Sequence, residues 1–379
     1  TGVLTGWRTS GRRTGIGQGP CGGPLVVHRR DSDGCNSPQA APNWPSKLVW
    51  RSPGLQTEPS PTTTAIGETG FGVAKVTFRL LISVFANNVL PPLLVIAAGF
   101  VLDKAVGVDL RSLSRVAIYI FTPALVIGSL IDTQVSSGEF GQLALFALAF
   151  LALMGIASRA VARLLRFDER RTNAFLLSTL FNNCGNYGLA VVLFAFGEGG
   201  LERGLVFFVV NALVGHTLAV YFASRGSFSG RDSLRNIFKL PLIYALAGTV
   251  IVRASGLAVP GPLMRAIDLP RAGAIPLMQL LLGAQLARTS RHIDLRFVAS
   301  ATAMRLIGGA AIALGLSALM GLSGLARGAS VVQASMPTAV SIVAFSIEFG
   351  SDSQEIGSVV FVSTLASALT LTVLIAFLS

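Results

Sequence analysis

The chain has 379 residues, of which 52% are hydrophobic and 13% are charged, and its mean hydropathy is +0.66. Soluble domains carry about 25% charged residues, so a soluble fold would leave much apolar surface in water, and the composition instead predicts an integral membrane protein. The net charge of +12 comes from basic residues between apolar runs, a pattern that argues against a nucleic-acid-binding protein.

Residues 1–76 differ in composition from the rest of the chain. They are rich in Gly, Pro, Ser, Thr and Arg and show no helical or strand periodicity, which favours disorder. No signal peptide is recognisable, because no apolar segment follows Arg12 and Arg13. The first methionine is Met154, so a second hypothesis is that this stretch is spurious translated sequence and that the native protein starts near Val73 or Val76.

Ten apolar runs follow, separated by short polar breaks. Most have about the 20 residues that a helix needs to cross a bilayer, and none alternates apolar and polar residues as barrel strands do. The sequence therefore predicts an all-α membrane protein with ten transmembrane helices. The predicted spans are residues 79–101, 112–131, 141–163, 173–196, 203–223, 238–254, 271–288, 295–321, 326–347 and 355–378.

The basic residues predict the orientation of these spans. Fifteen Lys and Arg residues lie in the breaks after spans 1, 3, 5 and 7, against seven on the opposite side. Because cytoplasmic loops carry the excess of Lys and Arg, the first set should face the cytoplasm. We then expect a multi-pass protein of the cell (inner) membrane, both termini outside, and a cytoplasmic linker over residues 225–237.

The chain also contains an internal repeat. When it is compared with itself at an offset of 153 residues, ten of the 25 positions from 196 to 220 are identical. Residues 77–224 and 238–379 are therefore predicted to be two five-helix repeats. Because five is odd, the second repeat enters the membrane in the opposite direction, and inverted repeats of this kind are typical of secondary transporters.

Spans 4 and 9 correspond in the two repeats, and each has polar or helix-breaking residues in its middle. Irregular backbone at membrane depth is tolerated where it is buried in protein or lines a wet cavity, and paired broken spans point to a transporter binding site. The N-terminal ends of two half-helices would offer free N–H groups to an anion. The alternative is polar packing between helices with a proline kink. The predicted substrate-binding residues are Asn182, Asn183, Gly185, Asn186, Tyr187, Gln333, Ser335, Pro337 and Thr338.

Other polar residues inside the spans are candidates for the same site. Arg305 lies about ten residues into span 8, and a buried cation is expensive in a membrane, so we assign it to a substrate carboxylate. The alternative is a structural arginine that binds backbone carbonyls or extends to the membrane surface. His216, Asn211 and Gln279 are candidates for proton or ion coupling, or else pack between helices.

Three segments resemble bacterial members of the auxin efflux carrier family of permeases: NNCGNYGLAVVLFAFG, IPLMQLLLGAQLA and ASMPTAVSIVAFSIEFG. The resemblance covers residues 78–379. It implies a scaffold domain from the first two helices of each repeat, crossing fourth and ninth helices, and small organic anions as substrates, dicarboxylates or auxin-like acids among them. The crossover positions fall on 182–188 and 333–338, and the basic position of helix 8 falls on Arg305. Family members often have Pro where this chain has Ala190.

The leading hypothesis is a secondary transporter of a small organic anion that works by alternating access. A cation/proton antiporter or sodium-coupled symporter of similar architecture is the alternative, although no Asp or Glu lies centrally in a span. Enzyme activity is not expected, because HExxH, GxSxG and paired intramembrane aspartates do not occur. We expect no cofactor and no metal, and the sequence leaves open whether transport is coupled to H⁺ or to Na⁺. The expected partners are a small carboxylate and the bilayer, a homodimer is one option, and no nucleic acid is expected.

Overall fold

The computed structural model describes residues 78–131, 133–223, 240–289, 294–343 and 353–378, without the side chains of 216–223 and 353. The expected extension 1–76 and linker 225–237 lie outside the described residues. No β-strand occurs within these ranges, which confirms the all-α prediction. The helices are η1 (Phe85–Val89), α2 (Leu90–Ala105), α3 (Leu110–Val116), η2 (Ala117–Phe121), α4 (Thr122–Leu130), α5 (Ser137–Leu164), α6 (Glu169–Leu180), η3 (Cys184–Gly188), α7 (Leu189–Ala223), α9 (Pro241–Ser255), α10 (Gly261–Ala287), α11 (Leu295–Ala303), η4 (Met304–Gly308), α12 (Gly309–Leu319), α13 (Gly324–Ala334) and α15 (Ser353–Leu378).

Several helices begin where a short polar side chain accepts an otherwise free backbone N–H group. Ser136 caps α5, and Asp109, Asp168 and Asp294 cap α3, α6 and α11. Each side chain satisfies one of the first N–H groups of its helix, which have no partner inside the helix. The starts of these helices are therefore encoded locally, at the polar breaks between the apolar runs.

Among the described residues, five helical stretches are long and apolar enough to cross a membrane. They are Phe78–Ala105, Leu110–Leu130, Ser137–Leu164, Leu295–Leu319 and Gln354–Leu378, and Pro241–Ser255 is a shorter apolar helix. The first, second and fourth each contain a π-helical turn, η1, η2 or η4. Turns of this kind are frequent at functional sites.

The structure corrects the prediction for span 7. We expected the helix to begin at residue 271, whereas α10 begins at Gly261 and continues through Pro270 and Pro276. Proline inside a helix removes a backbone hydrogen bond, but neighbouring helices in a membrane protein can compensate for that loss. Pro262 in the first turn also suits a helix start, since its missing N–H has no helical partner there.

Spans 4 and 5 also differ from their predicted boundaries. The stretch predicted as 173–196 is divided into α6 and α7 by residues 181–183 and the π-helical turn η3. In turn, α7 continues from span 4 into span 5 across Gly197, whose φ of 66° and ψ of −164° are not helical. Only glycine adopts such a conformation easily, so the turn between the two spans depends on this residue.

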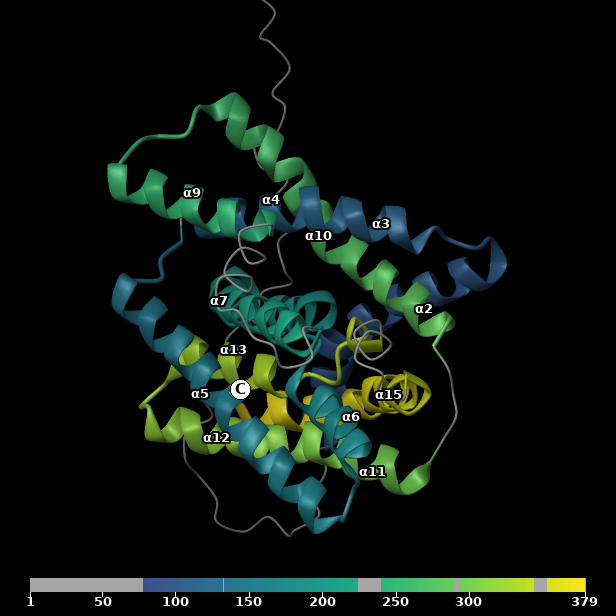
Figure 1. Cartoon of the computed structure of the whole chain (residues 1–379). Coiled ribbons are helices and arrows are strands. Elements are labelled where there is room, and N and C mark those ends of the chain that lie inside the picture. The colour runs from purple at the N-terminus through teal and green to yellow at the C-terminus, as the bar shows by residue number, and fades with distance from the viewer. Residues whose placement is uncertain (1–77, 132, 224–239, 290–293, 344–352, 379) are drawn as a thin grey trace, which may run out of the picture. The chain divides into compact units, whose positions relative to one another are not determined.

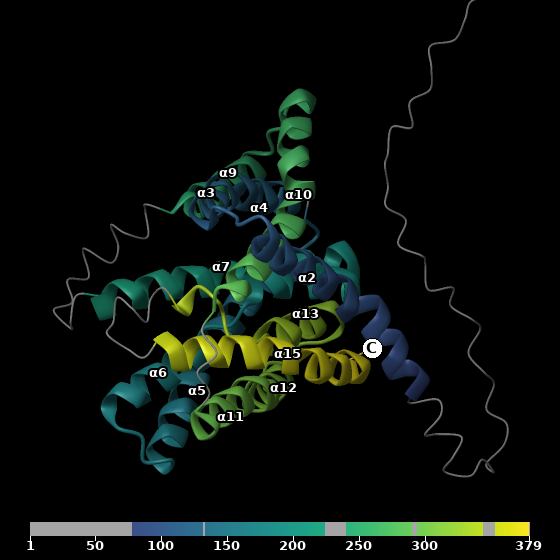
Figure 2. The same ribbon diagram turned by 90° about the vertical axis from the view of Figure 1, so that its right-hand side faces the viewer.

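The crossing of α2 and α10 brings their backbones very close together. A Cβ atom at Gly99 would overlap the carbonyl oxygen of Leu280, and one at Gly283 would overlap that of Ile96. Small residues permit such close helix packing in membranes, where burying apolar surface gives little advantage over lipid. In both views α2, α3, α4, α9 and α10 lie together (Figure 1, Figure 2).

The larger apolar core lies among α5, α6, α7, α11, α12, α13 and α15. It contains the stacked rings of Phe146 and Phe150 and the edge-on pair Phe175 and Phe297. A smaller cluster joins α4, α9 and α10 to α7. The segment that follows α6 therefore begins in the larger cluster, at Phe181, and reaches the smaller one at Leu189.

Candidate functional site at the two helix breaks

Two helices end inside the apolar core and are joined there by their backbones. After α6 ends at Leu180 and α13 ends at Ala334, Asn183 N donates to Pro337 O at 2.7 Å and Ala339 N donates to Phe181 O at 2.9 Å. These bonds form an antiparallel bridge between Asn182 and Thr338. Each break therefore supplies partners for backbone groups of the other, which is what a buried irregular segment requires.

Two side chains repeat this reciprocal pattern. Asn182 Nδ2 donates to Gln333 O, in the last turn of α13, at 2.7 Å. Thr338 Oγ1 donates to Ser178 O, in the last turn of α6, at 2.7 Å. The last carbonyl groups of a helix have no N–H partner within that helix. Each of these side chains therefore caps the helix of the opposite repeat. The symmetry of the sequence thus appears in the hydrogen bonds.

Arg305 connects both helix ends. The π-helical turn η4 carries it into the core, where it is fully buried. Its Nη1 donates to Thr179 O at 2.5 Å, its Nη2 donates to Ala334 O, and the group lies over the Phe150 ring, 5.5 Å from the ring centre. A cation at the C-terminal ends of two helices is favoured by their dipoles. This geometry matches the alternative given above for Arg305, a structural arginine that binds backbone carbonyls.

The remaining predicted site residues are distributed around this centre. Asn211 joins it, because its Nδ2 donates to Asn182 Oδ1 at 2.8 Å and to Cys184 Sγ at 2.9 Å. Ser335 Oγ donates to Val331 O in the last turn of α13, and Gly185 lies against the Phe208 ring. Tyr187 is fully buried and Asn186 is half-buried.

Of the two other residues proposed for coupling, only Gln279 has a described side chain. Gln279 is buried in α10, and no hydrogen bond in the described part of the chain connects it to them. The side chain of His216 lies outside the described residues. In the same described part, no group of three His, Cys, Asp or Glu residues is arranged to hold a metal ion.

Several buried polar atoms at the breaks have no hydrogen-bond partner among the described residues. They include Asn183 Nδ2, Asn211 Oδ1 and Gln333 Oε1. The other end of the Gln333 amide donates to Gly204 O at 3.1 Å. A buried polar group without a partner costs about 1–3 kcal/mol, so these atoms have an unused capacity to bind a polar ligand.

Sequence reasoning did not identify every residue that builds the site. Ser363 Oγ on α15 accepts from Thr338 N at 3.2 Å, and Gly204 O accepts from Gln333. A stripe of small polar residues on α15 could have indicated its contribution, since such residues often form hydrogen bonds between membrane helices. The stripe consists of Ser358, Ser363, Thr364 and Ser367. Gly204 gave no comparable signal, because its contribution is a backbone carbonyl.

The comparisons with known proteins agree with this architecture. A family model described as "Membrane transport protein" matches the chain twice, over residues 84–228 and 227–375. A protein named "Uncharacterized transporter" from Methanothermobacter thermautotrophicus is 26% identical over 296 residues, covering 75% of this chain and 95% of its own. Another from Methanocaldococcus jannaschii is 24% identical over 268 residues, covering 68% and 86%. The two matches confirm the family resemblance seen in the sequence, and the chain belongs to the membrane transport protein family, that of the auxin efflux carriers.

Proposed function

We propose that the protein is a secondary transporter of a small organic anion, such as a dicarboxylate or an auxin-like acid. Its ten helices would form two inverted five-helix repeats, and alternating access would occur around the two helix breaks. Membership of a transporter family supports transport rather than catalysis. The double family match, with its boundary near residue 227, supports the division into two repeats.

One observation carries this proposal: the breaks are reciprocally bonded, yet they leave buried polar side-chain atoms without a partner in the part of the chain that the structure describes. The N–H groups of Asn183 and Ala339 are already bonded across the breaks, so we do not assign anion binding to them. We assign it instead to side-chain amides, first of all to Asn183 Nδ2, which can donate to a carboxylate oxygen.

Arg305 has a different role in this proposal from the one that its sequence position suggested. Both Nη atoms are bonded to carbonyl oxygens, and the described residues place no carboxylate in an ion pair with it. Its uncompensated charge attracts an anion towards the breaks without direct contact, since charges interact strongly in a low-dielectric interior. It also holds the two helix ends together during the transport cycle.

Uptake into proteoliposomes tests the proposal. We expect wild-type protein to take up a labelled dicarboxylate or indole-3-acetate. Asn183→Asp should abolish uptake, because the new carboxylate repels the carboxylate of the substrate. Asn87→Asp is the matched control, because Asn87 is an exposed asparagine on η1. Imposed proton and sodium gradients would identify the coupling ion. Equal uptake by wild type and Asn183→Asp would contradict the assigned site.

A further inference from the structure

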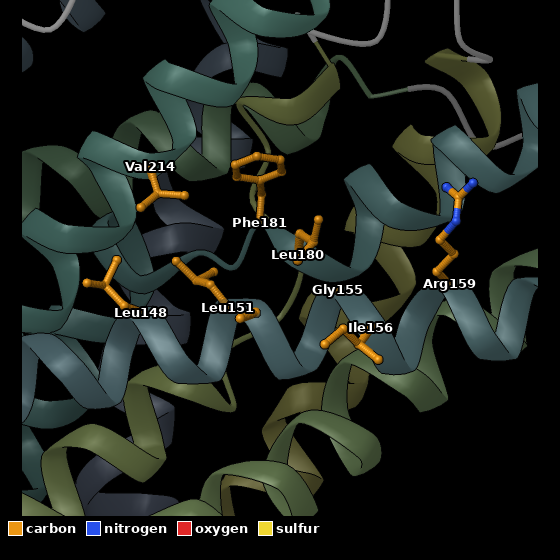
Figure 3. Close-up of a pocket in the computed structure, with 9 residues that line it drawn as sticks. Leu148, Leu151, Gly155, Ile156, Arg159, Leu180, Phe181 and Val214 are labelled. Carbon is orange, nitrogen blue, oxygen red and sulfur yellow. The ribbon is translucent and has the colours of Figure 1, made fainter. Parts of the chain in front are cut away.

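An apolar groove with a volume of about 470 Å³ lies beside the first helix break. Figure 3 shows one wall formed by successive turns of α5 and the other by Val214 on α7, with the residues that end α6 between them. The lining residues are Leu148, Leu151, Ala152, Gly155, Ile156, Arg159, Leu180, Phe181 and Val214. The groove thus joins the exposed apolar side of α5 to the break itself.

Arg159 is the one charged residue in this lining. It is exposed, and no hydrogen bond or ion pair to it is found among the described residues. In Figure 3 it stands at the opposite end of the row from Leu148 and Val214. A long apolar groove with a free guanidinium group at one end is complementary to a molecule that has an apolar tail and an anionic head.

The length of the groove indicates which amphiphile fits. Arg159 and Leu148 are eleven residues apart on α5, which corresponds to roughly 16 Å at 1.5 Å per residue. One leaflet contributes about half of the roughly 30 Å hydrocarbon core of a bilayer. A lipid whose head lies at Arg159 would therefore have its tail end near Leu148, where the groove also ends.

We propose that this groove binds one acyl chain of an anionic phospholipid and that the lipid phosphate pairs with Arg159. The basic residues around Arg159 predict that this end of α5 faces the cytoplasm, where a leaflet with anionic lipids attracts Arg and Lys side chains. This site is separate from the proposed anion site, and it does not depend on what the protein transports.

The lipid would contact the helix break directly. Phe181 lines the groove with its ring, while its carbonyl oxygen accepts the Ala339 N–H group that joins the two breaks. Gly215 leaves room for the Phe181 ring, because a Cβ atom there would lie 3.3 Å from Phe181 Cε1, closer than an ordinary contact. An acyl chain in the groove would fix Phe181 against α7 and so stabilise the break.

Native mass spectrometry of the full-length protein tests the proposal. The protein is reconstituted with phosphatidylcholine containing phosphatidylglycerol, and the lipids retained after release into detergent are counted. We expect wild-type protein to retain phosphatidylglycerol, and Arg159→Gln to retain about five-fold less of it. This factor corresponds to the contribution of one basic residue at an anionic membrane surface. Arg163→Gln is the matched control, because Arg163 is exposed on the same helix but does not line the groove.

A second pair of variants tests the acyl-chain part of the site. Ala152→Phe should fill the groove and reduce retention of phosphatidylglycerol, whereas Leu145→Phe, on the exposed apolar side of α5 but outside the groove, should not. Both positions are exposed, so neither variant disturbs the core. Equal losses in Arg159→Gln and Arg163→Gln would indicate general attraction by basic residues and would overturn the proposal. Equal retention of phosphatidylcholine and phosphatidylglycerol by wild type would also overturn it.

Discussion

The two helix breaks differ in length and composition. The first occupies residues 181–183 and contains no proline, whereas the second occupies residues 335–341 and contains Pro337. Each nevertheless gives one backbone N–H and one backbone carbonyl to the other, and one side-chain donor to the helix that ends at the other. Reciprocal capping, rather than a particular breaking residue, therefore maintains the pair of breaks.

Removing Arg305 affects both breaks at once and should have the largest effect. Arg305→Met leaves Thr179 O and Ala334 O without their donor. Hydrogen bonds to charged groups contribute about 1.5–3 kcal/mol each, so we expect a loss of about 3 kcal/mol or more in unfolding free energy. Thermal unfolding in detergent measures it.

Two further variants keep this prediction testable if Arg305→Met does not fold. Arg305→Lys should be intermediate, because an ammonium group cannot reproduce the fork that reaches two carbonyls. Arg296→Met is the control, since Arg296 is an exposed arginine that donates to Leu165 O. If Arg305→Met unfolds at the same temperature as Arg296→Met, the capping role is wrong.

Removing one side-chain cap at a time should separate the two breaks. Asn182→Ala removes the donor to Gln333 O and the acceptor for Asn211, whereas Thr338→Val removes only the donor to Ser178 O. Each buried group left without a partner costs about 1–3 kcal/mol, so Asn182→Ala should be the more destabilising. Thr249→Val, which loses a bond within its own helix, is the control for unfolding measurements. The reverse order would contradict this reasoning, in which the variant that leaves more buried groups without partners is the less stable.

Crowding the first break should have a moderate effect. A Cβ atom at Gly188 would overlap Gln333 Oε1 and lie 2.9 Å from Met336 Cγ. The Gln333 amide can rotate away, so Gly188→Ala should cost about 1–2 kcal/mol and weaken the bond to Gly204. Gly315→Ala has open space and should be neutral or slightly stabilising in a helix. Equal unfolding temperatures for the two variants would mean that Gly188 makes no special contact.

The smallest predicted effect lies away from the breaks, at the N-cap of α11. The pKa of Asp294 is lowered, chiefly by the backbone N–H of Phe297 and then by Arg171, which also binds Glu355. A lowered pKa stabilises the folded state above the unfolded value of about 3.9, and the benefit disappears as pH falls below it. Asp294→Asn should therefore be slightly less stable at pH 7, and the difference should shrink below about pH 4.

Thermal unfolding at a series of pH values checks this. Glu169→Gln is a suitable comparison, because Glu169 is exposed and has no hydrogen-bond partner within the described residues. A pH-independent difference between wild type and Asp294→Asn would rule out the assigned ionic contribution.

The helical class and the places where spans 4 and 9 break were predictable, because Asn, Gly and Pro interrupt otherwise apolar runs. The partners of Arg305 were not, since a π-helical turn orients its side chain and two backbone carbonyls from distant segments receive it. The start of α10 was missed because prolines inside a membrane helix resemble breakers in the sequence. Backbone acceptors such as Gly204 O leave no trace in residue identities.

The reciprocal bonding of the breaks has a consequence for biosynthesis. The end of α6 and the first break receive their partners from residues that follow far later in the chain: Arg305, Pro337, Thr338 and Ala339. At about 5–20 residues per second, the ribosome takes roughly 8–30 s to proceed from Asn183 to Ala339. During that interval the nascent first half carries exposed backbone groups that lipid cannot satisfy. Its insertion is therefore completed only when the second half arrives, and until then the translocon must shield these backbone groups from lipid.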